Sequence, residues 1–217
     1  MESYTAIVRF FQDGGVFMYP IVVVFAFGAA IAVERWLYLS LSRASSRKMW
    51  DDLLPLIEVG KIPQAMALTA KSKTAVARIL NYGLARATKT RRREDIETAM
   101  EEGLMEMVPR LEKRTHYLAT FANIATLLGL LGTIIGLIKA FTAVAHANPA
   151  EKADLLSASI SVAMNTTAFG LMAAIPLLLV YSVLQSKTTQ LVDSLEMAVV
   201  RFMNAISEIS TKPRAGA

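Results

Sequence analysis

The chain has 217 residues, of which 54% are hydrophobic and 19% charged, and its formal net charge at pH 7 is +5. This composition is too apolar for an ordinary soluble domain, yet it leaves enough charge for a sizeable part in water. The absence of cysteine excludes disulfides, zinc–thiolate sites and thiol catalysis.

Three long segments, 14–33, 117–138 and 155–186, contain no charged residue. Each reaches or exceeds the roughly 20 residues that an α-helix needs to cross a bilayer core. We therefore predict an all-α polytopic membrane protein with three transmembrane helices. A cleaved signal peptide is the weaker interpretation of the first segment, because Glu2 and Asp13 precede it and no basic leader does.

The predicted organisation has seven segments in chain order. They are a periplasmic amphipathic N-terminus (1–15), transmembrane helix one (16–39), a cytoplasmic helical domain (40–116), transmembrane helix two (117–145), a periplasmic loop (146–154), transmembrane helix three (155–185), and a cytoplasmic C-terminal helix and tail (186–217). Helices two and three are predicted to extend into the helical cytoplasmic domain. Pro109 is predicted to kink or break the helix that leads into helix two.

The distribution of basic residues predicts the orientation. Most Lys and Arg residues lie in 40–116 and after helix three, whereas 146–154 contains only Lys152. By the positive-inside rule the N-terminus is outside and the C-terminus is cytoplasmic. The basic cluster 91–93 could bind anionic lipid headgroups, but we favour a solvated loop. The loop interleaves acids and lacks aromatic residues, so nucleic-acid binding is not supported.

Small residues share one side of helix two. At about 100° per residue, the following positions lie within roughly a quarter-turn of each other: Ala125, Gly129, Gly132, Thr133, Gly136 and Ala140. A second small-and-hydroxyl face on helix three comprises Ser159, Ala163, Thr166, Thr167, Gly170 and Ala174. Glycine is costly inside a helix in water, so its repetition on one face predicts close approach of two helices in a bilayer. We assign helix packing to Gly129, Gly132, Gly136 and Gly170.

Polar groups inside a membrane favour a functional role. The candidate ion-pathway residues are Thr126 and Thr133 on helix two and Asn165, Thr166 and Thr167 on helix three. Asn165 lies off the hydroxyl face and could make an inter-helix hydrogen bond. The alternative is that each hydroxyl bonds only to a carbonyl of its own helix. Neither helix carries a carboxylate or histidine deep in its span, so a partner helix is expected to supply the acid of any ion path.

No enzyme motif is present, because the chain has no P-loop, no nucleophile elbow and no metalloprotease motif. The two histidines, His116 and His146, are predicted at opposite membrane faces and cannot form one site. We therefore expect neither catalysis, nor a cofactor, nor a tightly bound metal.

Several blocks of sequence share a recognisable pattern. They are 11–15 (FQDGG), 18–21 (MYPI), 34–35 (ER), 118–120 (LAT), 127–141 (LLGLLGTIIGLIKAF), 167–171 (TAFGL) and 174–176 (AIP). At this spacing they resemble the ExbB/TolQ/MotA family of energy-transducing ion-channel subunits. Three predicted spans rather than four make the chain similar to the ExbB/TolQ branch.

The resemblance implies a homopentamer in the lipids of a bacterial inner membrane. The pentamer would surround a dimer of an ExbD/TolR-like single-span partner that carries the ion-binding aspartate. Thr133 and Thr167 correspond to family threonines that line the path beside that aspartate. Ion flow would rotate the pentamer around the partner and so energise transport or other work at the cell envelope. A non-conducting membrane scaffold of an envelope complex is the alternative.

The chain departs from proton-type relatives at three positions. Val162 replaces a glutamate, Thr126 replaces a proline, and Thr166 replaces a small residue. Added hydroxyls and a lost acid suit a hard, partly dehydrated cation better than a proton relay. We therefore favour sodium, bound transiently near Thr133, Thr166 and Thr167, and keep the proton as the alternative ion.

Overall fold

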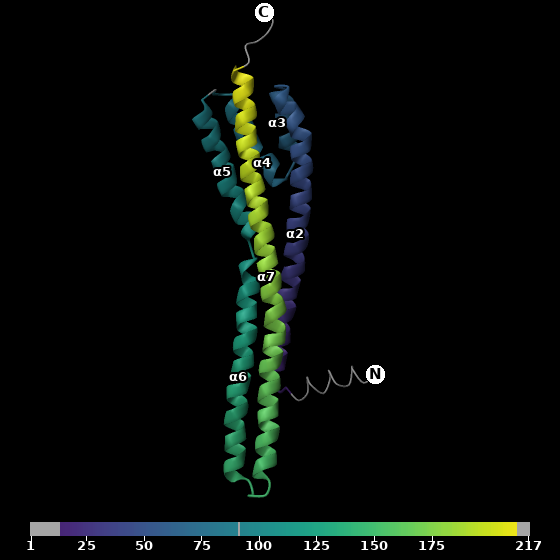
Figure 1. Ribbon diagram of the computed structural model, residues 1–217, viewed down its shortest axis with the longest axis vertical. Coiled ribbons are helices and arrows are strands. Elements are labelled where there is room, and N and C mark those ends of the chain that lie inside the picture. The colour runs from purple at the N-terminus through teal and green to yellow at the C-terminus, as the bar shows by residue number, and fades with distance from the viewer. Residues whose placement is uncertain (1–13, 91, 212–217) are drawn as a thin grey trace, which may run out of the picture. The chain divides into compact units, whose positions relative to one another are not determined.

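The computed structural model describes residues 14–90 and 92–211, and over these ranges it contains helices and no strand. In chain order the helices are α2 (Met18–Glu58), α3 (Ile62–Lys71), α4 (Ala75–Ala87), α5 (Arg93–Glu112), α6 (His116–His146) and α7 (Lys152–Thr211) (Figure 1). The predicted all-α class is therefore confirmed. The expected amphipathic start, 1–15, lies outside the described residues except for Gly14 and Gly15.

Within the residues that the structure describes, three helical stretches are long and apolar enough to cross a membrane, as predicted. They are Met18–Glu58, Arg93–His146, which contains α6, and Lys152–Ser207. Helix α2 continues past its apolar part to Glu58, and Gly60, which has a positive φ of 75°, follows its end. The predicted span 16–39 is thus the first part of a longer helix, and so is the span 155–185 in α7.

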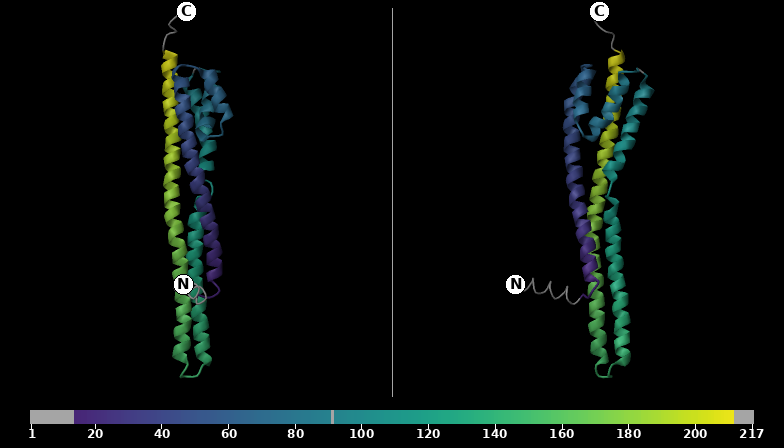
Figure 2. Two further views of the ribbon diagram at one scale, coloured as in Figure 1. Left: turned by 90° about the vertical axis from the view of Figure 1, so that its right-hand side faces the viewer. Right: turned by 180° about the vertical axis from the view of Figure 1, so that it is seen from behind.

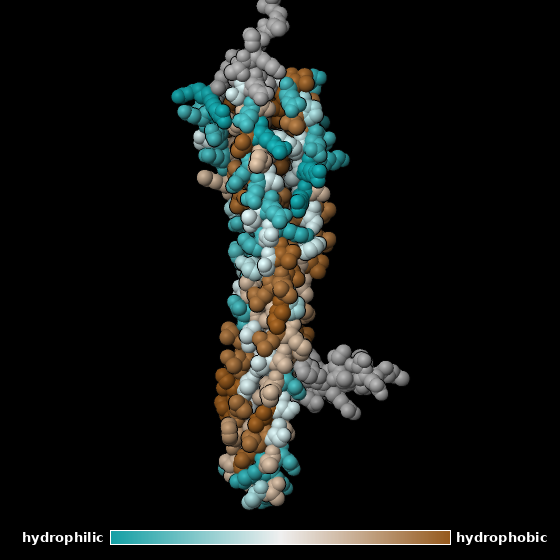
Figure 3. Space-filling model, in the orientation of Figure 1, coloured by the Kyte–Doolittle hydropathy of each residue, from teal (hydrophilic) through white to brown (hydrophobic). Residues whose placement is uncertain are grey.

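The chain forms two compact units. The first, the membrane unit, comprises residues 14–34 and 114–183, and the second, the polar unit, comprises residues 35–113 and 184–211. In the membrane unit α6 and the first half of α7 run antiparallel and are joined by a short turn (Figure 2). Figure 3 shows apolar side chains gathered on this helix pair and hydrophilic ones at the turn.

Large apolar side chains cover the outside of the membrane unit. Leu127, Ile138, Phe141, Met164 and Ile175 are each more than half exposed. A surface of this kind must be covered by lipid or by another protein chain. The membrane unit therefore has an inner seam of small residues and an apolar exterior.

In the polar unit, helix α4 packs against both α3 and α5. Ile79 and Leu80 of α4, Met100 of α5 and Phe202 of α7 are buried in its core. Tyr82, on the exposed side of α4, donates a hydrogen bond of 2.9 Å to Glu106 of α5. This bond to a carboxylate raises the pKa of Tyr82, because ionising the phenol would lose the donor and place two anions together.

The expected break at Pro109 occurs further along the chain. Helix α5 runs through Pro109 to Glu112, and the next helix begins at His116. Between them Arg114 has a positive φ of 66°, which ends the helical path. The last carbonyl groups of a helix have no N–H donor from a following turn. In the polar unit the guanidinium of Arg35 donates to one of these carbonyls at the end of α5, that of Leu111.

Candidate functional site

The two membrane helices α6 and α7 meet backbone to backbone at Gly129 and Gly170. A Cβ atom added to Gly170 would lie 2.7 Å from the carbonyl oxygen of Ala125 and 3.0 Å from Cα of Gly129. Both of those atoms are backbone atoms of α6 and have no rotamer to change. Only glycine therefore allows this distance between the helices.

The same seam continues along α6 at Gly132 and Gly136. A Cβ atom at Gly132 would overlap the side chain of Thr166, and one at Gly136 would lie 2.9 Å from Cβ of Ala163. Ala163 and Thr166 are themselves buried. The spaces left by these glycines are thus filled by small side chains of α7.

Where the backbones approach, the hydroxyl groups of Thr133 and Thr167 are in direct contact. Thr167 Oγ1 lies 3.0 Å from the carbonyl oxygen of Gly129. Thr133 Oγ1 lies 3.2 Å from that carbonyl and 3.3 Å from the carbonyl of Ala163. Because Gly129 has no side chain, its carbonyl is open to α7. Four oxygen atoms from two helices therefore gather at one half-buried point of the membrane unit.

This oxygen cluster has a definite chemistry. A threonine hydroxyl has one hydrogen, yet Thr133 has three acceptors within reach, so its hydrogen can point to any of them. Hydroxyl and carbonyl oxygens suit a hard cation. All four are uncharged, and α6 and the segment 155–183 contain no Asp or Glu. A cation at this point would need a negative charge from another chain to compensate its own.

Thr166 has a different environment from its neighbour. Its hydroxyl lies 2.6 Å from the carbonyl oxygen of Gly14 and 2.9 Å from that of Val162. The side chain is almost fully buried. Thr166 therefore ties the segment before α2 to α7, a connection between positions 152 residues apart that the sequence did not indicate.

The remaining two candidate residues do not join the cluster. Thr126 is exposed, and its hydroxyl donates over 3.1 Å to the carbonyl of Ala122 in its own helix. Asn165 is half-buried, and its side chain makes no hydrogen bond within the described ranges 14–90 and 92–211. The structure thus brings Thr133 and Thr167 together and adds the backbone oxygens of Gly129 and Ala163, which have no signature in the sequence.

A family model described as the MotA/TolQ/ExbB proton channel family matches residues 71–197, more than half of the chain. The matched range contains α6 and both threonines of the oxygen cluster. A protein described as a biopolymer transport protein ExbB homologue in Methanothermobacter thermautotrophicus is 29% identical, over 91% of this chain and 69% of its own length.

Two bacterial relatives add to this similarity. An ExbB-like biopolymer transport protein of Synechocystis sp. is 31% identical, over 84% of this chain and 72% of its own length. The Tol-Pal system protein TolQ of Haemophilus influenzae is 32% identical, over 51% of this chain and 46% of its own length. The range matched by the family model, 71–197, itself contains α4, α5, α6 and the first part of α7.

Proposed function

From the premise that the chain belongs to the MotA/TolQ/ExbB proton channel family, in its ExbB/TolQ branch, we propose that it conducts ions to power work at the cell envelope. It is a multi-pass membrane protein, and its family supplies proton channel subunits to energy-transducing complexes. We propose the bacterial inner membrane as its location, with the N-terminus periplasmic and the C-terminus cytoplasmic, because the basic residues are concentrated in 40–116 and after helix three, the segments that the positive-inside rule assigns to the cytoplasm.

The observation that carries the proposal is the contact between the hydroxyls of Thr133 and Thr167. An ion that loses part of its hydration shell in a membrane needs oxygen atoms to replace water. The cluster supplies these oxygens where two helices are closest. It lacks only the charge that an ion-binding carboxylate would add.

We propose that this carboxylate comes from an ExbD/TolR-like single-span partner present as a dimer. Five copies of the chain would surround that dimer and rotate around it as ions pass. Two observations support this assembly. The membrane unit has an extensive apolar exterior for contacts with further copies and lipid, and its oxygen cluster has no acid of its own.

The transported ion is proposed to be sodium rather than a proton. A proton relay uses titratable groups, whereas the cluster consists of hydroxyl and carbonyl oxygens. Val162 occupies the position at which proton-type relatives often have a glutamate, and it is exposed on α7. We place the ion at Thr133 and Thr167, since the hydroxyl of Thr166 is already engaged with Gly14.

Flux through the protein reconstituted with its partner in liposomes tests the choice of ion. We expect flux to rise with external sodium at constant pH and to vanish when potassium replaces sodium. The reason is that a neutral oxygen cluster selects a partly dehydrated cation and does not exchange protons. Flux that follows the pH gradient and ignores sodium would identify the proton as the ion.

Co-purification distinguishes the channel from a non-conducting membrane scaffold. We expect the solubilised chain to retain a single-span protein with an aspartate in or near its span, because the oxygen cluster needs a counter-charge. Mutation of that aspartate to asparagine should stop flux and leave the complex assembled. Stable envelope complexes formed without such a partner would support the scaffold.

A further inference from the structure

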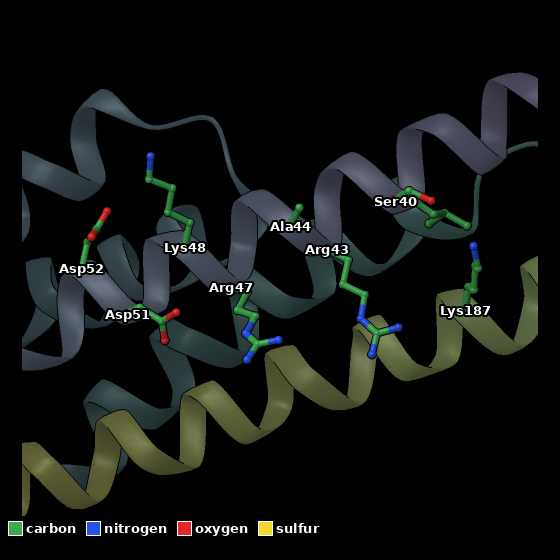
Figure 4. Close-up of a pocket in the computed structure, with 9 residues that line it drawn as sticks. Ser40, Arg43, Ala44, Arg47, Lys48, Asp51, Asp52 and Lys187 are labelled. Atoms are coloured by element: carbon green, nitrogen blue, oxygen red, sulfur yellow. The ribbon is translucent and has the colours of Figure 1, made fainter.

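A positively charged groove lies between α2 and α7 in the polar unit. Its larger part, about 760 Å³, is lined by Arg43, Arg47, Lys48 and Lys187, with Asp51 and Asp52 at one end. Figure 4 shows Arg43 and Arg47 pointing from α2 toward α7. The same two arginines also line a smaller cavity of about 300 Å³.

The smaller cavity has no acid in its wall. Arg201 of α7 joins Arg43 and Arg47 there, together with Trp50 and Ser46 of α2. The ion pairs among the described residues lie elsewhere, at Arg78–Glu106, Arg110–Glu106 and Arg114–Glu34. Three arginines thus line this cavity with no carboxylate in its described wall, and one of them, Arg43, also donates to Gln190 over 3.4 Å. Asp51 and Asp52 line only the larger part of the groove, so the excess positive charge makes the smaller cavity attractive to an anion.

Ser46 provides a second, independent indication of a ligand. Only 4% of this residue is exposed, and its hydroxyl has no hydrogen-bond partner within the described part of the chain. Buried polar groups almost always have a partner, and an exception often marks a missing ligand or ion. The hydroxyl oxygen is itself shielded in the orientation shown, so an oxygen-rich anion in the cavity would supply a partner once the Ser46 side chain turns to another rotamer.

We propose that this cavity binds the phosphate group of a soluble phosphorylated compound. Guanidinium groups bind phosphate through paired N–H···O bonds, and three of them match its several oxygen atoms. The half-buried ring of Trp50 forms an apolar wall beside them. The cavity is at the small end of ligand sites, which span roughly 300–1,000 Å³.

The length of α2 favours a soluble ligand over a lipid headgroup. Trp36, with the ammonium of Lys187 3.2 Å from its ring centre, has the character of a membrane-interface residue. Trp50 follows it by 14 residues in the same helix. At about 1.5 Å per residue this is about 21 Å, whereas a headgroup layer is only about 5–8 Å thick. The cavity therefore lies beyond the headgroups.

The two tryptophans of the chain make the test direct. A Trp36→Phe variant leaves Trp50 as the sole tryptophan, and we titrate this full-length protein in detergent with inorganic pyrophosphate at constant ionic strength. We expect a saturable change in Trp50 emission. Arg47→Gln and Arg201→Gln should each weaken binding about tenfold or more, since each removes a charged hydrogen-bond donor.

Arg86→Gln is the matched control, because Arg86 is exposed on α4 and lies outside the cavity. It should bind pyrophosphate like the parent.

Arg47→Lys keeps the positive charge and loses the paired N–H donors of the guanidinium group. Weakened binding by this variant, at an unchanged melting temperature, therefore supports the site even if a Gln variant does not fold. The absence of a saturable response to pyrophosphate would overturn the proposal. It would also be overturned if Arg86→Gln weakened pyrophosphate binding as much as Arg47→Gln and Arg201→Gln do. A response only to phosphatidylglycerol in mixed micelles, against phosphatidylcholine, would assign the site to lipid and overturn the soluble ligand.

Discussion

Replacement of Thr167 or Thr133 with valine is expected to reduce ion flux to background and to leave the assembled protein intact. Valine keeps the shape of threonine and removes only the hydroxyl. Each change therefore deletes one of the four oxygens at the seam between α6 and α7. An inter-helix hydrogen bond in a membrane contributes only about 0.6–2 kcal/mol, so the glycine seam should keep the helices together. Flux in liposomes and size-exclusion chromatography measure the two effects separately.

Thr142→Val is the matched control for these variants. Thr142 is also on α6, and its exposed hydroxyl donates 2.9 Å to the carbonyl of Ile138 in its own helix. This variant should conduct like the parent, because its hydroxyl faces neither Thr133 nor Thr167. Normal flux in both seam variants would remove the threonines from the ion path. Loss of assembly in either one would make the hydroxyl pair a structural contact.

The membrane unit shows which features local sequence can predict. A long apolar run and a small residue every third or fourth position are properties of one helix, so the three spans and the small faces could be located. The atoms that complete the site could not. The carbonyls of Gly129 and Ala163 are backbone groups that every residue possesses, and the Gly14 carbonyl reaches Thr166 only through the fold.

The helix ends were harder to predict for a related reason. Hydropathy shows where the chain leaves an apolar environment, whereas a helix ends where its backbone path changes. Helix α2 accordingly continues through its charged part to Glu58, and the helix before α6 ends near Arg114 rather than at Pro109. The arginine cavity of the polar unit is the extreme case, because Arg43 and Arg201 come from opposite ends of the chain and no periodicity relates them.

Gly170→Leu is expected to prevent stable assembly, because the new side chain meets backbone that cannot move away. Its Cβ alone would lie 2.7 Å from the Ala125 carbonyl oxygen and 3.0 Å from the Gly129 Cα. Overpacking costs about 1–3 kcal/mol where side chains can shift, and separating two backbones should cost more. It would also pull Thr167 away from Thr133, so any protein that survives should not conduct. Thermal melting in detergent and the oligomer peak measure the loss.

Ala168→Leu tests whether the effect comes from the seam or from leucine itself. Ala168 is two residues away in α7 and is exposed, so the larger side chain faces lipid or a neighbouring copy instead of α6. We expect its melting temperature to stay near that of the parent. Gly136→Ala should fall between the two, since its new methyl would lie 2.9 Å from the Ala163 methyl rather than against backbone. If Gly170→Leu melts like the parent, the backbone contact does not hold α6 and α7 together, and the position of the hydroxyl pair then needs another cause.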